Sequence, residues 1–198
     1  MVWALKKMGN SRGADKASVV VEMIKYAGVG FQTVLLKFYN DIIYCTKIPE
    51  NWHVTIFSML PKSGNLECPS NWRPIAMLPI LYKIFAKMLY YRLYPILDVC
   101  QANSQFGFRR NKRIEDVFAI LESIIGKANE WNLPLWMISL DLRKAFDKIK
   151  FLPLFTAIRD QGVPECYVQL LAALYEHQKG SVNGNAFFNI ERDVNEAR

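Results

Sequence analysis

Apolar residues recur at helical spacing through much of the chain, and the longest stripe covers residues 80–97. Its apolar positions fall three or four apart, while Lys83 and Lys87 lie off the stripe. This spacing predicts an amphipathic helix that packs one face against a core. Weaker stripes predict further helices over residues 19–26, 31–44 and 164–175. Another helix is expected after residue 113, with inward-facing residues Val117, Phe118, Leu121, Ile124 and Ile125.

Short apolar runs bounded by turn residues predict a few strands. One covers residues 54–60, and a second covers residues 135–140 and is closed by Asp141. The second run is apolar at successive positions, which is typical of a strand buried on both faces. Asn183 and Gly184, between β-type residues, predict a hairpin. Helices with a few strands far apart in sequence indicate an α+β fold with a helix-rich first half.

Composition and charge narrow the class of protein. The chain has 198 residues, 52% of them apolar, and a formal net charge of +7 from 25 Lys and Arg against 18 Asp and Glu. This apolar content is that of a globular protein rather than a disordered one. The positive charge favours a polyanionic partner, although moderately basic proteins without nucleic acid are common.

Four dispersed cysteines, Cys45, Cys68, Cys100 and Cys166, form no CxxC pair, and there are only two histidines. We therefore expect neither a zinc site nor disulfides, but reduced and mostly buried thiols. The first residues lack the apolar run of a signal peptide, and no apolar stretch reaches the ~18 residues of a membrane span. We expect an intracellular protein, nuclear or cytoplasmic, with no visible targeting signal and no membrane partner.

Four short blocks in a fixed order carry the most specific signal. They are Leu-Pro-Lys-Ser-Gly at 60–64, Asn-Trp-Arg-Pro-Ile at 71–75, Gln-Phe-Gly-Phe-Arg at 105–109 and Ser-Leu-Asp-Leu-Arg-Lys-Ala-Phe-Asp at 139–147. In this order they resemble the reverse transcriptases of non-LTR retroelements. The resemblance runs from about Ala4 to Ile190.

The resemblance implies an incomplete right-hand polymerase fold. Residues 1–134 would form helix-rich fingers with basic loops, and residues 135–198 would form the beginning of the palm. Related enzymes continue with Arg-Gly-Val-Arg-Gln-Gly near the end of this chain. Here Asp193 and Ala197 replace the two glycines. We therefore expect a chain that is truncated within the palm or diverged there, with a C-terminal palm and thumb portion missing.

Asp141 matches the first catalytic aspartate of that family, and the carbonyl of Leu142 would be a further metal ligand. Polymerases hold two metal ions ~3.5–4 Å apart, which requires carboxylates from more than one strand. The family's second site, an aromatic-Ala-Asp-Asp turn, is not in these 198 residues. The resemblance thus implies Mg²⁺ for the complete enzyme and an incomplete site here. The alternative is that Asp141 merely caps the next turn.

Three residues match the family's nucleotide-binding positions. Lys62 and Arg73 would grip the triphosphate of the incoming nucleotide, which needs a point charge and a planar guanidinium fork. Phe146 would lie beneath the sugar and exclude a 2′-hydroxyl, so that deoxynucleotides are preferred. The alternatives are solvated loop cations for the first two and a core aromatic for Phe146.

Gly107, Phe108 and Arg109 match a block that lies along the template in related enzymes. Arg110, Lys112 and Arg113 add positive charge, which would hold a phosphate backbone without reading its sequence. The alternative is a solvated basic loop.

These observations predict a fragment of an RNA-directed DNA polymerase, with an RNA template, a DNA primer and deoxynucleoside triphosphates as partners. Because one of its two carboxylate sites is missing, we expect the chain alone to be inactive. The alternative is a non-catalytic nucleic-acid-binding remnant of a decayed retroelement.

Overall fold

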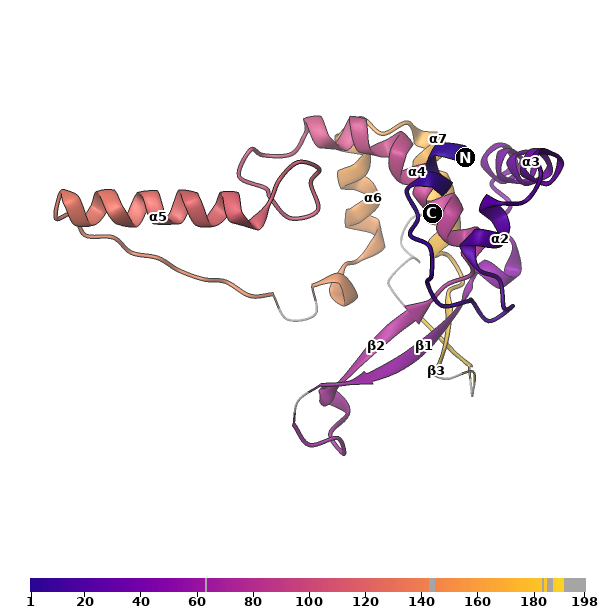
Figure 1. Cartoon of the computed structure of the whole chain (residues 1–198), viewed down its shortest axis with the longest axis horizontal. Coiled ribbons are helices and arrows are strands. Elements are labelled where there is room, and N and C mark those ends of the chain that lie inside the picture. The colour runs from indigo at the N-terminus through magenta and orange to yellow at the C-terminus, as the bar shows by residue number, and fades with distance from the viewer. Residues whose placement is uncertain (63, 143–144, 183, 185–186, 191–198) are drawn as a thin grey trace.

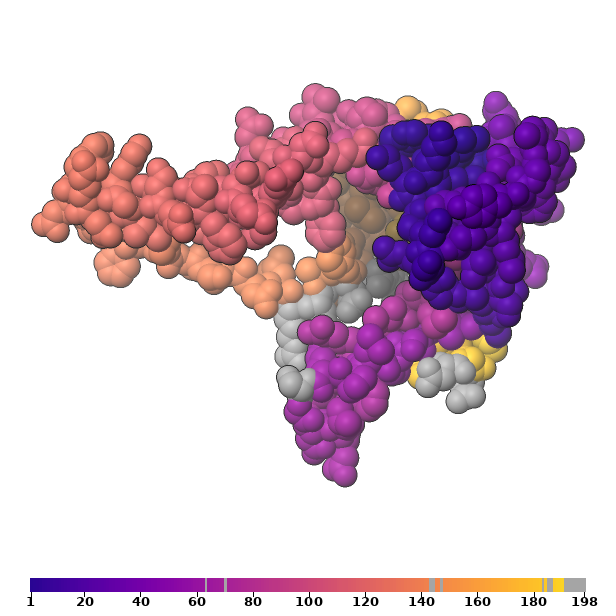
Figure 2. All heavy atoms as spheres, viewed as in Figure 1, coloured from indigo at the N-terminus to yellow at the C-terminus, as the bar shows by residue number. Residues whose placement is uncertain are grey.

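The computed structural model describes residues 1–62, 64–142, 145–182, 184 and 187–190. One long helix, α4 (Ile80–Val99), crosses the body of the molecule (Figure 1). The other helices of the body are α1 (Val2–Lys6), α2 (Val21–Lys25), α3 (Val29–Cys45), α6 (Phe151–Asp160) and α7 (Glu165–Tyr175). Helix α5 (Ile114–Glu130) projects from the body as an arm, and the β1–β2 hairpin projects in another direction (Figures 1 and 2). Short 3-10 turns are η1 (Glu50–Trp52), η2 (Pro69–Asn71) and η3 (Phe146–Lys148).

A four-stranded sheet joins the hairpin to the end of the described chain. Strands β1 (Val54–Pro61), β2 (Trp72–Met77), β3 (Lys179–Val182) and β4 (Phe187–Asn189) lie in the order β2-β1-β3-β4. The β1–β2 and β3–β4 pairs are antiparallel, whereas β1 and β3 are parallel. The combination of helices with a small mixed sheet confirms the expected α+β class, and the β3–β4 pair confirms the hairpin predicted around Gly184.

Gly180 of β3 allows two aromatic rings to close over the strand. A Cβ at this position would lie 2.5 Å from the Phe188 ring and 2.9 Å from the Phe57 ring. The two rings stack with their centroids 6.3 Å apart and their planes 14° apart. The absence of a side chain at Gly180 therefore permits this cross-strand stacking, because any other residue would displace both rings.

The predicted stripe of α4 forms the centre of the main hydrophobic core. Five of its residues join side chains from α1, α2, α3, η1 and α7 in one cluster. Each large apolar side chain buried there stabilises the fold by about 1.5–3 kcal/mol relative to its exposure. The buried members are Ala4, Leu5, Val21, Ile24, Leu35, Tyr39, Ile42, Trp52, Ile80, Ile84, Phe85, Met88, Leu89, Leu170 and Leu174.

A second cluster lies farther along α4, where α6 and α7 pack against it. Its buried members are Leu93, Phe151, Phe155, Val163 and Val168. The Phe151 and Phe155 rings stack with a centroid separation of 6.0 Å. Helix α4 thus contributes to both clusters and connects the first and last helices of the body.

Asp15 ties the N-terminal loop to the first turn of α4. Its Oδ1 accepts hydrogen bonds from the amides of Ala17 and Val19, each at 3.0 Å, and its Oδ2 accepts one from the Ile80 amide at 2.8 Å. The first amides of a helix lack partners within the helix, and Pro79 at the N-cap has no side-chain hydrogen bond to offer. Asp15 therefore caps α4 from 65 residues away.

Residues 133–142 do not form the predicted strand. They are extended, without helix or strand, and their apolar side chains face solvent: Trp136 is 91% exposed, Ile138 85% and Leu140 87%. The prediction of a strand buried on both faces is wrong for this structure. A buried strand needs backbone partners on a neighbouring strand, and the described sheet is built from four other segments.

The inward-facing stripe predicted for α5 is also wrong. The helix itself is present, but Phe118, Leu121, Ile124 and Ile125 are exposed, and no residue of α5 is buried. The physical reason is that α5 projects from the body, so that none of the described helices and strands covers its apolar face (Figure 1). All four cysteines are exposed, which corrects the expectation of buried thiols.

No helix in the described part of the chain has both the length and the apolarity needed to cross a lipid bilayer.

Candidate nucleic-acid interface

The β1–β2 hairpin carries the two cations expected to bind a triphosphate. Cα pairing places Arg73 opposite Leu60 and Trp72 opposite Pro61. Lys62 follows the last pair, and its amide donates to the Asn71 carbonyl at 2.7 Å. Both cationic side chains are exposed. The hairpin therefore brings Lys62, which directly follows β1, and Arg73, which lies on β2, to its outer end, although they are eleven residues apart in sequence.

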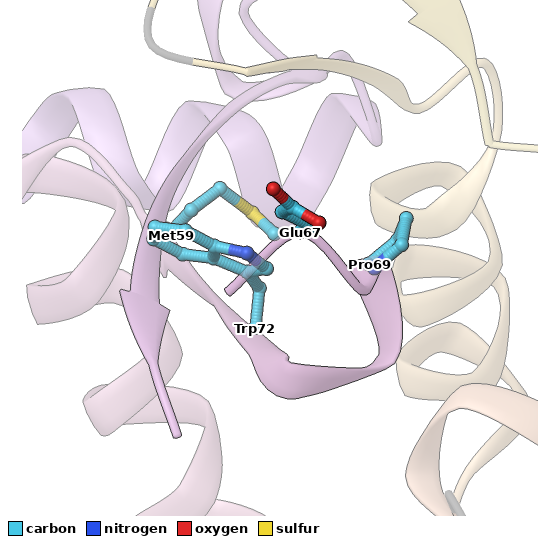
Figure 3. A pocket seen from close by; sticks show the side chains of 4 residues that line it. All are labelled: Met59, Glu67, Pro69 and Trp72. Atoms are coloured by element: carbon cyan, nitrogen blue, oxygen red, sulfur yellow. The ribbon is translucent and has the colours of Figure 1, made fainter. Parts of the chain in front are cut away.

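The Trp72 indole braces the loop that joins these strands. Its Nε1 donates to the Leu66 carbonyl at 2.8 Å, across the loop. A shallow pocket of about 390 Å³ is lined by Met59, Glu67, Pro69 and Trp72, and in Figure 3 the Met59 side chain lies against the indole. Trp72 thus stabilises the outer end of the hairpin from within its own loop.

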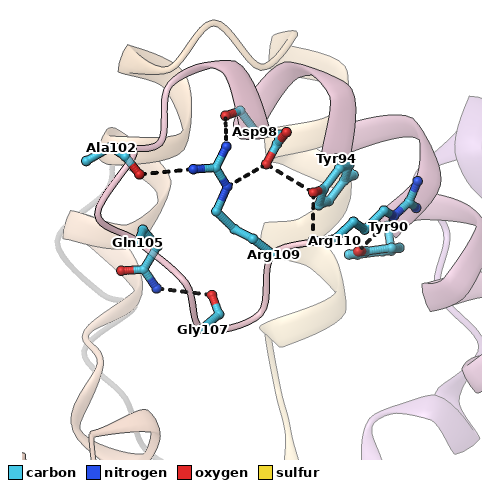
Figure 4. Close-up of polar contacts among 8 residues, drawn as sticks. All are labelled: Tyr90, Tyr94, Asp98, Ala102, Gln105, Gly107, Arg109 and Arg110. Atoms are coloured by element: carbon cyan, nitrogen blue, oxygen red, sulfur yellow. Dashed lines mark hydrogen bonds and ion pairs between the residues drawn. The ribbon is translucent and has the colours of Figure 1, made fainter. Parts of the chain in front are cut away.

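Arg109 is anchored to the end of α4. Its Nε donates to Asp98 Oδ1 at 2.9 Å and its Nη1 donates to the Ala102 carbonyl at 3.0 Å (Figure 4). The Arg109 side chain is only 12% exposed. Its hydrogen bond holds the pKa of the Asp98 carboxyl below the ordinary value, and a hydrogen bond from Tyr94 acts in the same direction. Arg109 therefore fixes the basic loop onto α4.

Arg110 lies among tyrosines of the same helix. Its guanidinium carbon is 4.2 Å from the centroid of the Tyr94 ring and 4.7 Å from that of Tyr91, distances typical of cation–π contact. Its backbone amide donates to the Tyr94 hydroxyl at 3.0 Å, and its Nε donates to the Tyr90 hydroxyl at 3.4 Å (Figure 4). The sequence analysis did not identify this contact. A signal existed in the spacing of Tyr90 and Tyr94, which puts both rings on one face of α4.

The structure brings two of the predicted site residues together. Phe108 of the basic loop and Phe146 of η3 form a T-shaped ring pair with centroids 5.7 Å apart and planes at 89°. Both rings are largely exposed. Gly107 precedes this pair, and its carbonyl accepts a hydrogen bond from Gln105 Nε2 at 3.1 Å. The block expected to lie along the template and the residue expected to select the sugar are thus in contact.

Asp141 and Leu142 lie in the exposed extended segment. Within the described residues, no group of three or more His, Cys, Asp or Glu side chains could together hold a metal ion. The donors here therefore do not fit a two-metal site on their own, because one carboxylate and one carbonyl supply too few ligands. The altered C-terminal block, residues 191–198, lies outside the described residues.

Comparison with known proteins shows to which family the chain is similar. The profile of the family described as reverse transcriptase (RNA-dependent DNA polymerase) matches residues 60–193. The probable RNA-directed DNA polymerase from transposon X-element of Drosophila melanogaster is 29% identical over 162 residues, which cover 79% of this chain and 17% of that protein. The Pol polyprotein from the type-1 retrotransposable element R2 of Popillia japonica is 30% identical over 118 residues, or 60% of this chain and 16% of that protein.

A third relative covers nearly the whole chain. The probable RNA-directed DNA polymerase from transposon BS of Drosophila melanogaster is 24% identical over 196 residues, which are 97% of this chain and 21% of that protein. The chain thus spans about a fifth or less of the length of these relatives. Because the family profile covers more than half of the chain and the relatives come from non-LTR elements, the chain belongs to the reverse transcriptase family, within its non-LTR retroelement branch.

Proposed function

We propose that this chain forms the fingers and the beginning of the palm of an RNA-directed DNA polymerase, with residues 1–134 as fingers and residues 135–198 as palm. The whole protein would copy an RNA template from a DNA primer. The observation that carries this proposal is the projecting hairpin, in which Arg73 pairs with Leu60 and Lys62 follows two residues later, within the segment that the family profile matches.

Lys62 and Arg73 would hold the triphosphate of a deoxynucleotide. A lysine provides a compact point charge and an arginine a planar fork of donors, so together they can bind two phosphate groups in a defined orientation. Phe146 would lie beneath the sugar and exclude a 2′-hydroxyl by its bulk.

The template would run along the basic loop at Gly107 and Phe108. The Arg109 side chain pairs with Asp98. We therefore assign this side chain the role of positioning the loop, and the Arg109 backbone would contact the template. Lys112 and Arg113 follow in the same loop and would neutralise phosphates without reading bases.

Mg²⁺ is the metal that the complete polymerase would require. Asp141 and the Leu142 carbonyl would be two of its ligands, and further carboxylates would have to come from outside the described residues. When bound, the metal would polarise the phosphoryl group.

The triphosphate site can be tested by nucleotide titration. We expect the 198-residue chain to bind dATP more tightly than dAMP at fixed ionic strength, because extra phosphates meet Lys62 and Arg73. Lys62→Gln and Arg73→Gln should reduce this difference, whereas Lys37→Gln on α3, an exposed lysine elsewhere, should not. Equal affinities for dATP and dAMP in the unaltered chain would refute the assignment.

A non-catalytic nucleic-acid-binding remnant is the second candidate. An incomplete metal site favours it, because among the described residues Asp141 belongs to no group of three or more His, Cys, Asp or Glu side chains that could hold a metal ion. Both functions predict RNA binding, and only the polymerase predicts phosphate-dependent nucleotide binding at the hairpin.

A further inference from the structure

Phe108 is presented to solvent in an unfavourable conformation. Its side chain is 88% exposed, and its backbone has a φ of +62°. A non-glycine residue in the left-handed region costs roughly 1–2 kcal/mol. An exposed phenylalanine also forgoes the stabilisation that burial would give. Neither the left-handed backbone nor the exposure of Phe108 is offset by packing inside the body. Backbone strain of this kind concentrates at functional sites.

The loop around Phe108 is anchored on both sides of this residue. On one side, Gln105 bonds to the Gly107 carbonyl; on the other, Arg109 pairs with Asp98 and the Arg110 amide bonds to Tyr94 (Figure 4). These contacts determine where the ring stands without burying it. The loop therefore holds the Phe108 ring at the surface, exposed to solvent.

A second exposed ring completes the arrangement. Phe146, 67% exposed, meets Phe108 in the T-shaped geometry described above. In a T-shaped pair one ring presents its edge to the face of the other. Phe108, at 88% exposed, keeps most of its surface accessible for stacking within this contact. Cations are close in the same loop, where Lys112 Nζ lies 4.9 Å from the centroid of the Phe106 ring.

We propose that the exposed Phe108 ring, held in place by its contact with Phe146, is a stacking platform for an unpaired base of single-stranded nucleic acid. This inference rests on the proposed template-binding function and names how the strand is held. Every base has a π-face, so stacking on an aromatic ring binds a strand whatever its sequence. Lys112 and Arg113 would contact the phosphates of the same strand, which gives the salt-dependent part of the affinity.

The test compares a single-stranded RNA of about 12 nucleotides with an abasic strand of equal length. This length lies within the ~4–16 nucleotides that a single-strand-binding domain covers. Fluorescence anisotropy of the 198-residue chain should give an RNA affinity that falls roughly 5- to 100-fold in Phe108→Ala, the range expected for one lost stacked base. The abasic strand should bind both proteins equally. Phe108→Leu, which keeps an apolar side chain but no ring, should lose as much as Phe108→Ala.

Phe118→Ala is the matched control, because Phe118 is an exposed phenylalanine on the α5 arm. It should leave RNA affinity unchanged. The platform is refuted if Phe108→Ala binds RNA like the unaltered chain, if it weakens the abasic strand equally, or if its effect is confined to free dATP.

The double variant Lys112→Gln and Arg113→Gln separates this inference from the proposed function. If it loses RNA affinity while Phe108→Ala does not, template binding stands and the platform is wrong. If the unaltered chain binds neither strand, both the platform and the template-binding function are wrong.

Discussion

Replacing Asp15 with alanine should destabilise the first turn of α4 and, with it, the main hydrophobic core. The Asp15 carboxylate accepts hydrogen bonds from two amides of its own loop and from the Ile80 amide at the start of α4. Ile80 is 5% exposed and packs in the main cluster, so the capped turn is part of the core. Loss of the carboxylate would leave the Ile80 amide without its acceptor.

The expected magnitude follows from the contacts. The bond to Ala17 is exposed, so water can replace it, whereas the bonds to Val19 and Ile80 are partly buried. At about 1 kcal/mol for each partly buried bond, the loss is about 2 kcal/mol, which is also the upper end for removing an N-cap. In a protein of this size, that corresponds to a fall in Tm of roughly 4–8 °C.

Urea unfolding followed by far-UV circular dichroism measures this loss, and amide hydrogen exchange at Ile80 locates it. Asp15→Asn keeps one acceptor oxygen and should lose about half as much. Asp41→Ala, at an exposed position on α3, is the control and should change stability by less than about 0.5 kcal/mol. An unchanged urea midpoint in Asp15→Ala, with the Ile80 amide still protected, would refute the capping role.

Three further predictions concern activity, acid stability and local order. The 198-residue chain should not extend a primer on an RNA template with Mg²⁺, and incorporation that Asp141→Ala abolishes would contradict this. The lowered pKa of Asp98 means that its ionised form stabilises the fold above the ordinary aspartate pKa, and that this contribution disappears as the pH falls through the folded value. The urea midpoints of the unaltered chain and Asp98→Asn should therefore differ at about pH 6 and converge in acid, once the pH has fallen below the lowered pKa of Asp98; a difference that persists in acid would refute the linkage. Amides of Trp136 and Ile138 should exchange rapidly, since they lie outside helix and strand; slow exchange there in a monomer would mean that this segment is structured in solution.

Helix α4, strand β1 and the β3–β4 hairpin could be predicted because local sequence determines them. The α4 stripe keeps one face apolar through Leu93, and each of its buried positions was part of the predicted pattern. The β3–β4 pair follows from a turn signal at Gly184, whose φ of +82° suits glycine. A periodic pattern over fewer than about twenty neighbouring residues is enough to predict such an element.

The partners of individual side chains could not be predicted in the same way. Arg109 was expected along the template, and the sequence gives no reason to pair it with Asp98 rather than with a phosphate. Only the path of the loop over the end of α4 brings the two within 2.9 Å. The contact between Phe108 and Phe146 likewise depends on how two segments 38 residues apart meet in space.

Residues 133–142 illustrate why an apolar run predicts burial only together with its neighbours. A strand buried on both faces requires a hydrogen-bonding partner beside it and a packing layer above and below. The described sheet has β2 and β4 at its two edges, and the segment that ends at Asp141 joins neither. The described sheet therefore does not fix the position of the Asp141 carboxylate. A metal ligand must be held firmly in place by its surroundings, so a catalytic role for Asp141 requires that residues 135–140 first enter a sheet. Hydrogen exchange across this segment would therefore show whether this condition for a metal site is met.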